Sequence, residues 1–219
     1  MDVRTTKRLE SGLTLIEVAL IILVIAVMGI VVLAPTLARR DAVAGHVNCV
    51  NNLKQIGIAF KVWSLDCGAR YPMAVPGTNG GSKEWVSTGL AAPHFRVMSD
   101  ELSSPIVLVC PEDPARHVAT NFAMLSTSNL SYFVGVDASD ENPQMFLSGD
   151  RNLTTNGVAL RGGAFHTLRS NTVAGWTPQI HRTYGNILLD DGSVQRWTAA
   201  ELRKGLERTG AETNRLAVP

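Results

Sequence analysis

The sequence predicts an α+β protein in which a long N-terminal helix, transmembrane in its first half, packs on the antiparallel β-sheet of a globular head. Three observations predict this class. Residues 13–34 are almost entirely apolar, and an amphipathic segment continues the same predicted helix to about residue 66. Beyond it, short β-rich segments and turn signals replace helical periodicity. We therefore divide the chain into residues 1–12, 13–66 and 67–219.

The apolar segment 13–34 has the length of a membrane span, since about 20 apolar residues in a helix cross about 30 Å of hydrocarbon. Glu17 is its exception. An ionised carboxylate within a bilayer costs at least about 2.5 kcal/mol, so such a residue is usually paired and functional. No basic residue occurs within residues 9–38. Cleavage after Gly12 would supply a cation, the new amino group of Leu13. This group would lie one helical turn from the Glu17 carboxylate of its own chain, or close to the Glu17 carboxylate of a neighbouring subunit.

Residues 11–17, SGLTLIE, resemble the prepilin processing site of type IV pilins and type II secretion pseudopilins. In that family a membrane-bound prepilin peptidase cuts after the glycine and methylates the new N-terminus. The resemblance therefore implies that residues 1–12 are a leader, that the bond between Gly12 and Leu13 is cut, and that Leu13 is N-methylated. It also implies that Glu17 helps to register subunits in a helical filament. The family most often has phenylalanine where Leu13 stands, and leucine keeps a large apolar side chain there.

Two other interpretations of the N-terminal segment stay open. A secretory signal peptide would use Arg4, Lys7 and Arg8 as its basic region and residues 36–38 as its cleavage site, but its apolar region usually runs for only about 7–15 residues. A plain single-pass anchor explains the length but not the acid at position 17. Basic residues flank the span on both sides, so their count does not orient it. The resemblance implies a bacterial inner-membrane protein with its head in the periplasm.

An apolar stripe marks the part of the helix that should meet the head. Its members recur every three or four positions, which is one face of an α-helix: Cys49, Leu53, Ile56, Phe60 and Trp63. We expect the helix to end at about Asp66, because Gly68 favours a left-handed stop. The natural partner for the stripe is an antiparallel sheet built from the later chain.

The head carries five strand signals, in residues 106–110, 132–136, 144–147, 186–190 and 193–197. The last two form the clearest hairpin, because Asp191-Gly192 suits the positive φ angles of a tight turn. Thr198 and Glu201 have the spacing of a capping box, which predicts a short final helix.

His181 precedes Asp191-Gly192 by nine intervening residues, which resembles the H-X9-DG signature of a large group of bacterial pseudopilin-like proteins. Residues 47–57 resemble a stretch that is common in the same group. Together with the leader, these matches imply a pilin-like fold, a helical spine against a β-rich head. For His181 we favour a hydrogen-bonded role that fixes the hairpin over a metal-binding or catalytic role.

The chain contains three cysteines, which allow at most one internal disulfide. On one continuous helix Cys49 and Cys67 would lie about 27 Å apart, far beyond the roughly 4 to 7 Å between the α-carbons of a disulfide. Cys110 is therefore the expected partner of one of them. Chains that resemble this one often have cysteines at the positions of Cys49 and Cys110, and this favours that pair.

Two acidic groups are candidate calcium ligands, because some secretion pseudopilins bind calcium through acidic loops and the ion prefers oxygen ligands. They are Asp137 with Asp140 and Glu141, and Asp190 with Asp191. Neither group has a recognised loop spacing, so we favour solvated turn residues and expect no cofactor.

The composition argues against catalysis and against nucleic-acid binding. The five histidines never form H-E-x-x-H, and no G-x-S-x-G occurs, so we expect no enzyme. The formal net charge is +1, and the basic residues are scattered rather than clustered. We therefore expect no nucleic-acid partner.

The predicted function is that of a structural subunit in a type II secretion pseudopilus or a type IV pilus-like filament. Its expected partners are a prepilin peptidase, other pilin or pseudopilin subunits, an inner-membrane assembly platform and the lipid bilayer. The alternative is a membrane-anchored head that binds a ligand, such as carbohydrate, and does not polymerise. Trp85 and Trp176 would be the first candidates for such contacts if they were exposed.

Overall fold

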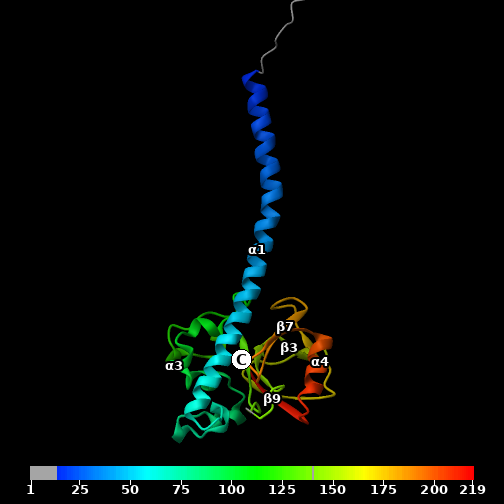
Figure 1. The fold of residues 1–219 in the computed structure, drawn as a ribbon. Coiled ribbons are helices and arrows are strands. Elements are labelled where there is room, and N and C mark those ends of the chain that lie inside the picture. Colours follow the sequence, from blue (N-terminus) through cyan, green and yellow to red (C-terminus); the bar gives the residue numbers. More distant parts are fainter. Residues whose placement is uncertain (1–13, 140) are drawn as a thin grey trace, which may run out of the picture. The chain divides into compact units, whose positions relative to one another are not determined.

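The computed structural model describes residues 14–139 and 141–219, with the side chains of residues 32–44 and 46 left undescribed. The chain forms two compact units, Met1–Val43 and Ala44–Pro219. Helix α1 (Leu15–Asp66) contributes to both (Figure 1). The α+β class and the expected helix end at Asp66 are confirmed. Residues 1–12 and Leu13, which contain the predicted leader and cleavage site, lie outside the described residues.

Residues 44–66, the last part of α1, belong to the second unit together with the whole head. Among the described residues, two antiparallel sheets form here, a six-stranded one in the order β5-β9-β1-β2-β7-β8 and a three-stranded one in the order β4-β3-β6. The strands are β1 (Tyr132–Gly135), β2 (Phe146–Asp150), β3 (Leu153–Thr155), β4 (Val158–Ala159), β5 (Ala164–Arg169), β6 (Ala174–Trp176), β7 (Tyr184–Leu189), β8 (Val194–Thr198) and β9 (Thr213–Val218).

Short helices fill the connection between α1 and the sheet, and one further helix, α4, lies between β8 and β9. The α-helices after α1 are α2 (Ala92–Arg96), α3 (Ser99–Leu102) and α4 (Ala199–Arg208). The 3-10 helices are η1 (Pro72–Ala74), η2 (Gly77–Asn79), η3 (Lys83–Thr88), η4 (Pro105–Leu108), η5 (Phe122–Met124) and η6 (Thr127–Asn129).

The larger sheet separates two hydrophobic cores, because successive side chains of a strand point to opposite faces. In β7, Leu188 joins the core that contains the α1 stripe, while Ile187 and Leu189 join the core beneath α4. In β9, Ala217 likewise faces α1, and Leu216 faces α4. The sheet is therefore buried on both faces, by α1 and the short helices on one side and by α4 on the other.

The apolar stripe of α1 packs into the first of these cores, as the sequence predicts. Cys49, Leu53, Ile56 and Phe60 are fully buried, and Trp63 is nearly so. Full burial of a leucine, isoleucine or phenylalanine side chain stabilises the fold by about 1.5 to 3 kcal/mol. The stripe thus fixes residues 44–66 of α1 to the sheet within the second unit.

The C-terminal hairpin and its following helix are confirmed. Strands β7 and β8 pair through the Asp191-Gly192 turn, where Gly192 has a φ of +83°. The N–H of Thr198 donates to Glu201 Oε2 at 2.8 Å and Thr198 Oγ1 accepts from the N–H of Glu201, which completes the capping box of α4.

Two strand predictions need correction. Residues 106–110 do not form a strand, because Pro105 begins η4 and Ser104 Oγ accepts the N–H of Ile106, which caps a helical turn instead. The strand predicted at residues 144–147 is shifted, since β2 begins at Phe146 and continues to Asp150. The prediction at residues 132–136 is confirmed by β1.

Within the part of the chain that the structure describes, no helical stretch meets the length and hydrophobicity that a bilayer crossing requires. The predicted span covers residues 13–34, of which only Thr14–Val31 have described side chains.

We expect Gly135→Ala to destabilise the head by about 2 kcal/mol or more, because a Cβ at this position of β1 would overlap the carbonyl oxygen of Phe146 in β2. Thermal unfolding followed by near-ultraviolet circular dichroism measures the loss. Gly29→Ala is the matched control, because a Cβ on Gly29 has no neighbour within 4 Å and should leave the head's melting temperature unchanged. Equal melting temperatures for Gly135→Ala and the wild type would contradict the observed pairing of β1 with β2.

Candidate functional site

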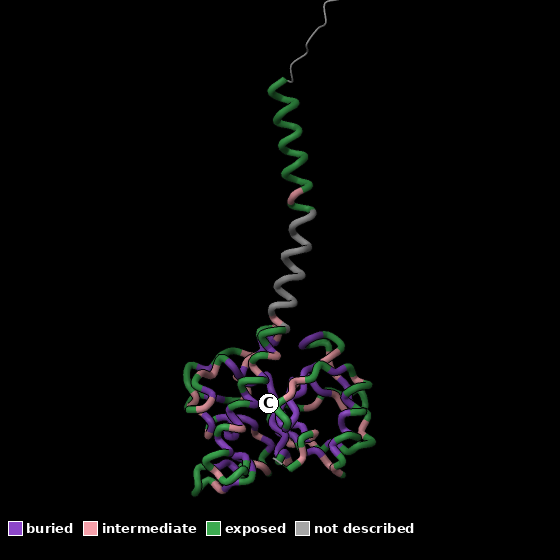
Figure 2. The backbone as a smooth tube through the Cα atoms, in the orientation of Figure 1, coloured by how far each residue is buried: buried purple, intermediate pink, exposed green. Residues whose placement is uncertain are grey.

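The first candidate site is the start of α1, where apolar side chains are open to solvent. Most of this stretch of α1 is exposed (Figure 2). Its large apolar residues from Leu15 to Val31 are exposed, and Leu15 is 89% exposed. In a soluble monomer, contiguous apolar surface of this extent marks a site of interaction with protein or lipid. These side chains therefore require a cover that the chain itself does not provide among its described residues.

Glu17 contributes to the beginning of this helix. Both the backbone N–H and the Oγ1 hydroxyl of Thr14 donate to Glu17 Oε2 at 2.8 Å. This is one of the two hydrogen bonds of a capping box, in which an acidic side chain accepts the backbone N–H of the residue three positions before it, at the start of the helix. This local contact was not predicted, although the spacing Thr14-x-x-Glu17 indicates it. Gly12 and Leu13, the other predicted residues of this site, lie outside the described residues.

The second candidate site surrounds a disulfide between Cys49 of α1 and Cys110, which follows η4. The predicted pairing of Cys49 with Cys110 is therefore confirmed. The two α-carbons are 5.1 Å apart, and the cysteines are 61 positions apart in the sequence. Closing a loop of this length removes unfolded-state entropy equivalent to about 4 kcal/mol. The disulfide therefore holds α1 to the segment that leads into the sheet, while Cys67 is a free thiol.

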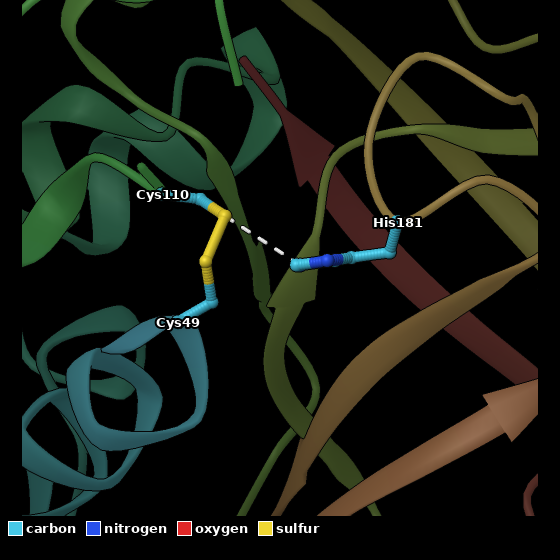
Figure 3. A group of neighbouring side chains, drawn as sticks. All are labelled: Cys49, Cys110 and His181. Carbon is cyan, nitrogen blue, oxygen red and sulfur yellow. Dashed lines mark hydrogen bonds between the residues drawn. A yellow bond between two sulfur atoms is a disulfide. The ribbon is translucent and has the colours of Figure 1, made fainter. Parts of the chain in front are cut away.

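His181 points at this disulfide from the connection between β6 and β7 (Figure 3). The ring is buried, and its Nε2 lies 3.5 Å from Cys110 Sγ. On the other side of the ring, Nδ1 donates to Glu112 Oε2 at 2.8 Å. The imidazole also stacks on Tyr184, with ring centroids 5.5 Å apart. His181 is thus held in one orientation, with Nε2 directed at sulfur.

Asp150, at the end of β2, completes the cluster. Its Oδ2 lies 3.5 Å from His181 Nε2 and accepts hydrogen bonds from the N–H and the Nδ2 of Asn186, at 2.6 and 3.0 Å. Complete burial raises the pKa of Asp150 to about 6, although the charge of His181 and the hydrogen bonds from Asn186 act in the opposite direction. The structure thereby brings one disulfide, one imidazole and two carboxylates together in a largely buried space.

The neighbouring loop is fixed by close packing and by an ion pair. Gly45 of α1 allows the Glu112 carboxylate to approach the helix, since a Cβ there would lie 3.0 Å from Glu112 Oε1. Asp113 pairs with Arg151 through two 2.7 Å hydrogen bonds and accepts a third from Ser131. Burial favours a raised pKa for Asp113, but these partners lower it below its ordinary value. The loop is therefore anchored on both sides of Glu112.

The residues of the H-X9-DG signature have separate roles. Asp191 Oδ1 accepts the N–H of Ser193 at 2.8 Å, and Gly192 supplies the positive φ of the turn. His181 lies against the disulfide and hydrogen-bonds to Glu112. It reaches the hairpin through Asp150, which binds Asn186 in β7.

The acidic groups considered for calcium already have protein partners. Arg215 forms a salt bridge with Asp137, and Lys61 Nζ lies 3.3 Å from Asp190 Oδ2. Asp140 lies outside the described residues. These contacts favour structural roles for Asp137 and Asp190.

Of the two tryptophans considered for ligand contact, Trp85 is 46% exposed. Trp176 is half-buried, and its ring packs against Gly185 so closely that a Cβ there would overlap it. Trp85 alone of the two therefore presents an accessible ring.

Sequence reasoning missed Glu112 and Asp150 as members of the cluster. One signal was available, because Asp150 ends a strand whose other residues are apolar or small, and an acid in such a place needs a partner. Glu112 follows Cys110 by two positions, but nothing local connects it with His181, 69 positions away.

Comparison with protein-family models, with curated proteins and with solved structures finds no match to this chain.

We expect Asp150→Asn to change the pH dependence of stability. Because the pKa of Asp150 is about 6 in the folded chain and near 3.8 otherwise, the folded state binds this proton more tightly. The contribution of this proton to the unfolding free energy is complete below about pH 4 and is lost as the pH rises through about 6. The slope is at most about 1.4 kcal/mol per pH unit. The unfolding free energy of the wild type minus that of the variant, measured in urea, should therefore fall across this range.

The unfolding free energies of the wild type and of Asp150→Asn must be subtracted because His94 also titrates. Burial lowers the pKa of His94 to about 4, so its contribution to stability rises with pH. This contribution is the same in both proteins and cancels in the difference. Asp191→Asn, a substitution at an exposed turn residue, is the matched control. A difference that does not change with pH would show that Asp150 does not titrate as its burial requires.

Proposed function

We propose that this chain is a structural subunit of a type IV pilus-like or type II secretion pseudopilus filament, with a pilin-like fold. In this proposal a prepilin peptidase cuts after Gly12, and the mature subunit assembles through α1. The observation that carries the proposal is the exposed apolar start of α1 with one acid, Glu17, near its first residue.

The exposed apolar side chains favour two successive environments. Each Å² of apolar surface removed from water stabilises a structure by about 25 cal/mol, so Leu15–Val31 should always be covered. Before assembly the cover is lipid, with residues 13–34 in the bacterial inner membrane and the head in the periplasm. After assembly the cover is a bundle of the same helices from neighbouring subunits.

Glu17 makes the exchange of lipid for protein specific. A carboxylate in an apolar environment requires a cation or strong hydrogen bonds. Thr14 supplies two hydrogen bonds to the carboxylate, and the amino group of Leu13 on a neighbouring processed subunit would supply the charge. Polymerisation then buries the apolar helix and pairs the acid in one step.

The later part of α1 adds a second apolar surface. While one face packs on the sheet, Ile58, Val62 and Leu65 are exposed at helical spacing, and Leu65 is 80% exposed. These residues line a groove beside the Asp191-Gly192 turn. A helix from a neighbouring subunit fits such a stripe, which supports assembly along α1.

The disulfide suits a subunit that transmits force. Cys49 ties α1 covalently to Cys110, and Asn52 Nδ2 donates to the carbonyl of Val109 at 3.0 Å. A pull on the helix would therefore be carried into the head by a covalent bond as well as by packing.

We expect Glu17→Ala to leave processing intact but to reduce incorporation into filaments at least about tenfold, as a lost interaction of more than about 1.4 kcal/mol would do. Sheared filaments and membranes are compared by quantitative immunoblotting. Glu10→Ala is the matched control, because Glu10 would leave with the leader and should not affect assembly.

Normal incorporation of Glu17→Ala would remove the assembly role of this residue. Correct processing without any filament, together with ligand binding by the head, would favour the anchored ligand-binding protein instead.

A further inference from the structure

The sulfurs of Cys49 and Cys110 and a ring nitrogen of His181 all lie within 4.8 Å of one another, and all three residues are buried. Two cysteine sulfurs and an imidazole are typical donors for zinc, which takes four ligands in a tetrahedron at structural sites. A carboxylate oxygen, Asp150 Oδ2, is 3.5 Å from His181 Nε2. Cys49, Cys110 and His181 therefore supply three donors once the sulfurs are thiolates, and Asp150 beside His181 is the candidate for the fourth.

We propose that the reduced, dithiol form of this cluster binds one zinc ion through Cys49, Cys110, His181 and Asp150. The site is separate from the filament-forming helix surface, so it does not rest on the proposed function.

The spacing of the donors matches a zinc tetrahedron. With Zn–S near 2.3 Å and Zn–N near 2.0 Å, neighbouring sulfur and nitrogen ligands are about 3.5 Å apart. The observed distance from Cys110 Sγ to His181 Nε2 is 3.5 Å. Nitrogen and oxygen ligands would be about 3.3 Å apart, against the observed 3.5 Å between His181 Nε2 and Asp150 Oδ2. The two sulfurs must separate to about 3.8 Å, which rotation of the Cys49 side chain achieves once the bond is broken. The Asp150 carboxylate lies outside the group of donors within 4.8 Å of one another, so it must also move toward the sulfurs.

The surrounding contacts are those that a zinc site requires. Glu112 accepts from His181 Nδ1, which leaves Nε2 as the coordinating nitrogen and fixes the ring. Asn186 donates twice to Asp150 and orients that carboxylate. Asp150 Oδ1 is buried and has no hydrogen-bond partner among the described residues. A cation beside this carboxylate would compensate an oxygen that is otherwise unsatisfied.

The chemistry balances with a dithiol as reductant. The dithiol delivers two electrons and two protons to the disulfide, so that Cys49 and Cys110 each become a thiol, and the dithiol itself becomes a cyclic disulfide. Zinc then displaces the two thiol protons into solvent. A small-molecule disulfide reverses the reaction, because it accepts the two electrons and becomes two thiols while the bond between Cys49 and Cys110 re-forms. Both thiolate ligands are then lost, so the disulfide and the zinc ion exclude each other.

The test uses the full chain, reduced with a water-soluble phosphine, which becomes the phosphine oxide and does not compete for zinc as a dithiol does. After incubation with zinc and desalting, we expect about one zinc per chain in the reduced protein and less than about a tenth in the oxidised protein. Cobalt in place of zinc should give tetrahedral absorption bands and a sulfur-to-cobalt charge-transfer band.

Substitutions identify the ligands. His181→Gln and Asp150→Asn should each weaken zinc binding by at least about tenfold, and Glu112→Gln should weaken it through the orientation of the ring. Cys67→Ser and His117→Gln are the matched controls, because neither side chain belongs to the cluster, and both should bind zinc like the wild type.

If reduction alone unfolds the head, zinc should restore its near-ultraviolet circular dichroism. A folded reduced chain without bound zinc would overturn the proposal. So would an octahedral cobalt spectrum, loss of binding in Cys67→Ser, or an unfolded reduced chain that zinc does not rescue.

Discussion

Burial of the α1 stripe against the larger sheet is the interaction on which the head depends. Residues 44–66 supply a continuous part of the core, and α1 is the element against which the short helices and the sheet pack. The disulfide adds a covalent bond at the same face. The residues around that bond are positioned by their neighbours. Gly45 leaves room for the Glu112 carboxylate, and Asn186 donates a hydrogen bond to the Asp150 carboxylate. His181 lies between these two acids. The buried polar cluster is therefore a consequence of how the helix docks.

The same helix carries two different burial requirements. Residues 44–66 satisfy theirs within the chain, whereas Leu15–Val31 expose apolar side chains and one acid. Lipid can cover the apolar side chains but pairs poorly with the acid, and a bundle of processed subunits can satisfy both. Under the proposed function, the head is a folded unit that presents this helix for assembly, and the disulfide reinforces the packing that connects the two.

Features set by local sequence could be predicted, and features set by long-range contacts could not. The stripe, the Asp191-Gly192 turn and the Thr198 cap depend on residues within a few positions of one another, so spacing alone located them. The strand prediction for residues 106–110 was wrong. Their β-branched composition indicates a strand, whereas the proline and the serine cap beside them produce a helical turn. The role of His181 could not be predicted for a different reason. Its distant partners come from three separate segments, at positions 49, 110 to 112 and 150, which only the fold brings together.

The central claim is that the chain enters a filament through a processed N-terminus. Mass spectrometry of the N-terminal peptide, from protein isolated out of its native membrane, tests it most directly. Assembly by this route requires a mature chain that begins at N-methylated Leu13, with the first twelve residues removed. An N-terminus near Arg39 would indicate an ordinary secreted protein, and an intact Met1 would indicate a simple anchor. Either of these results would contradict the proposed function.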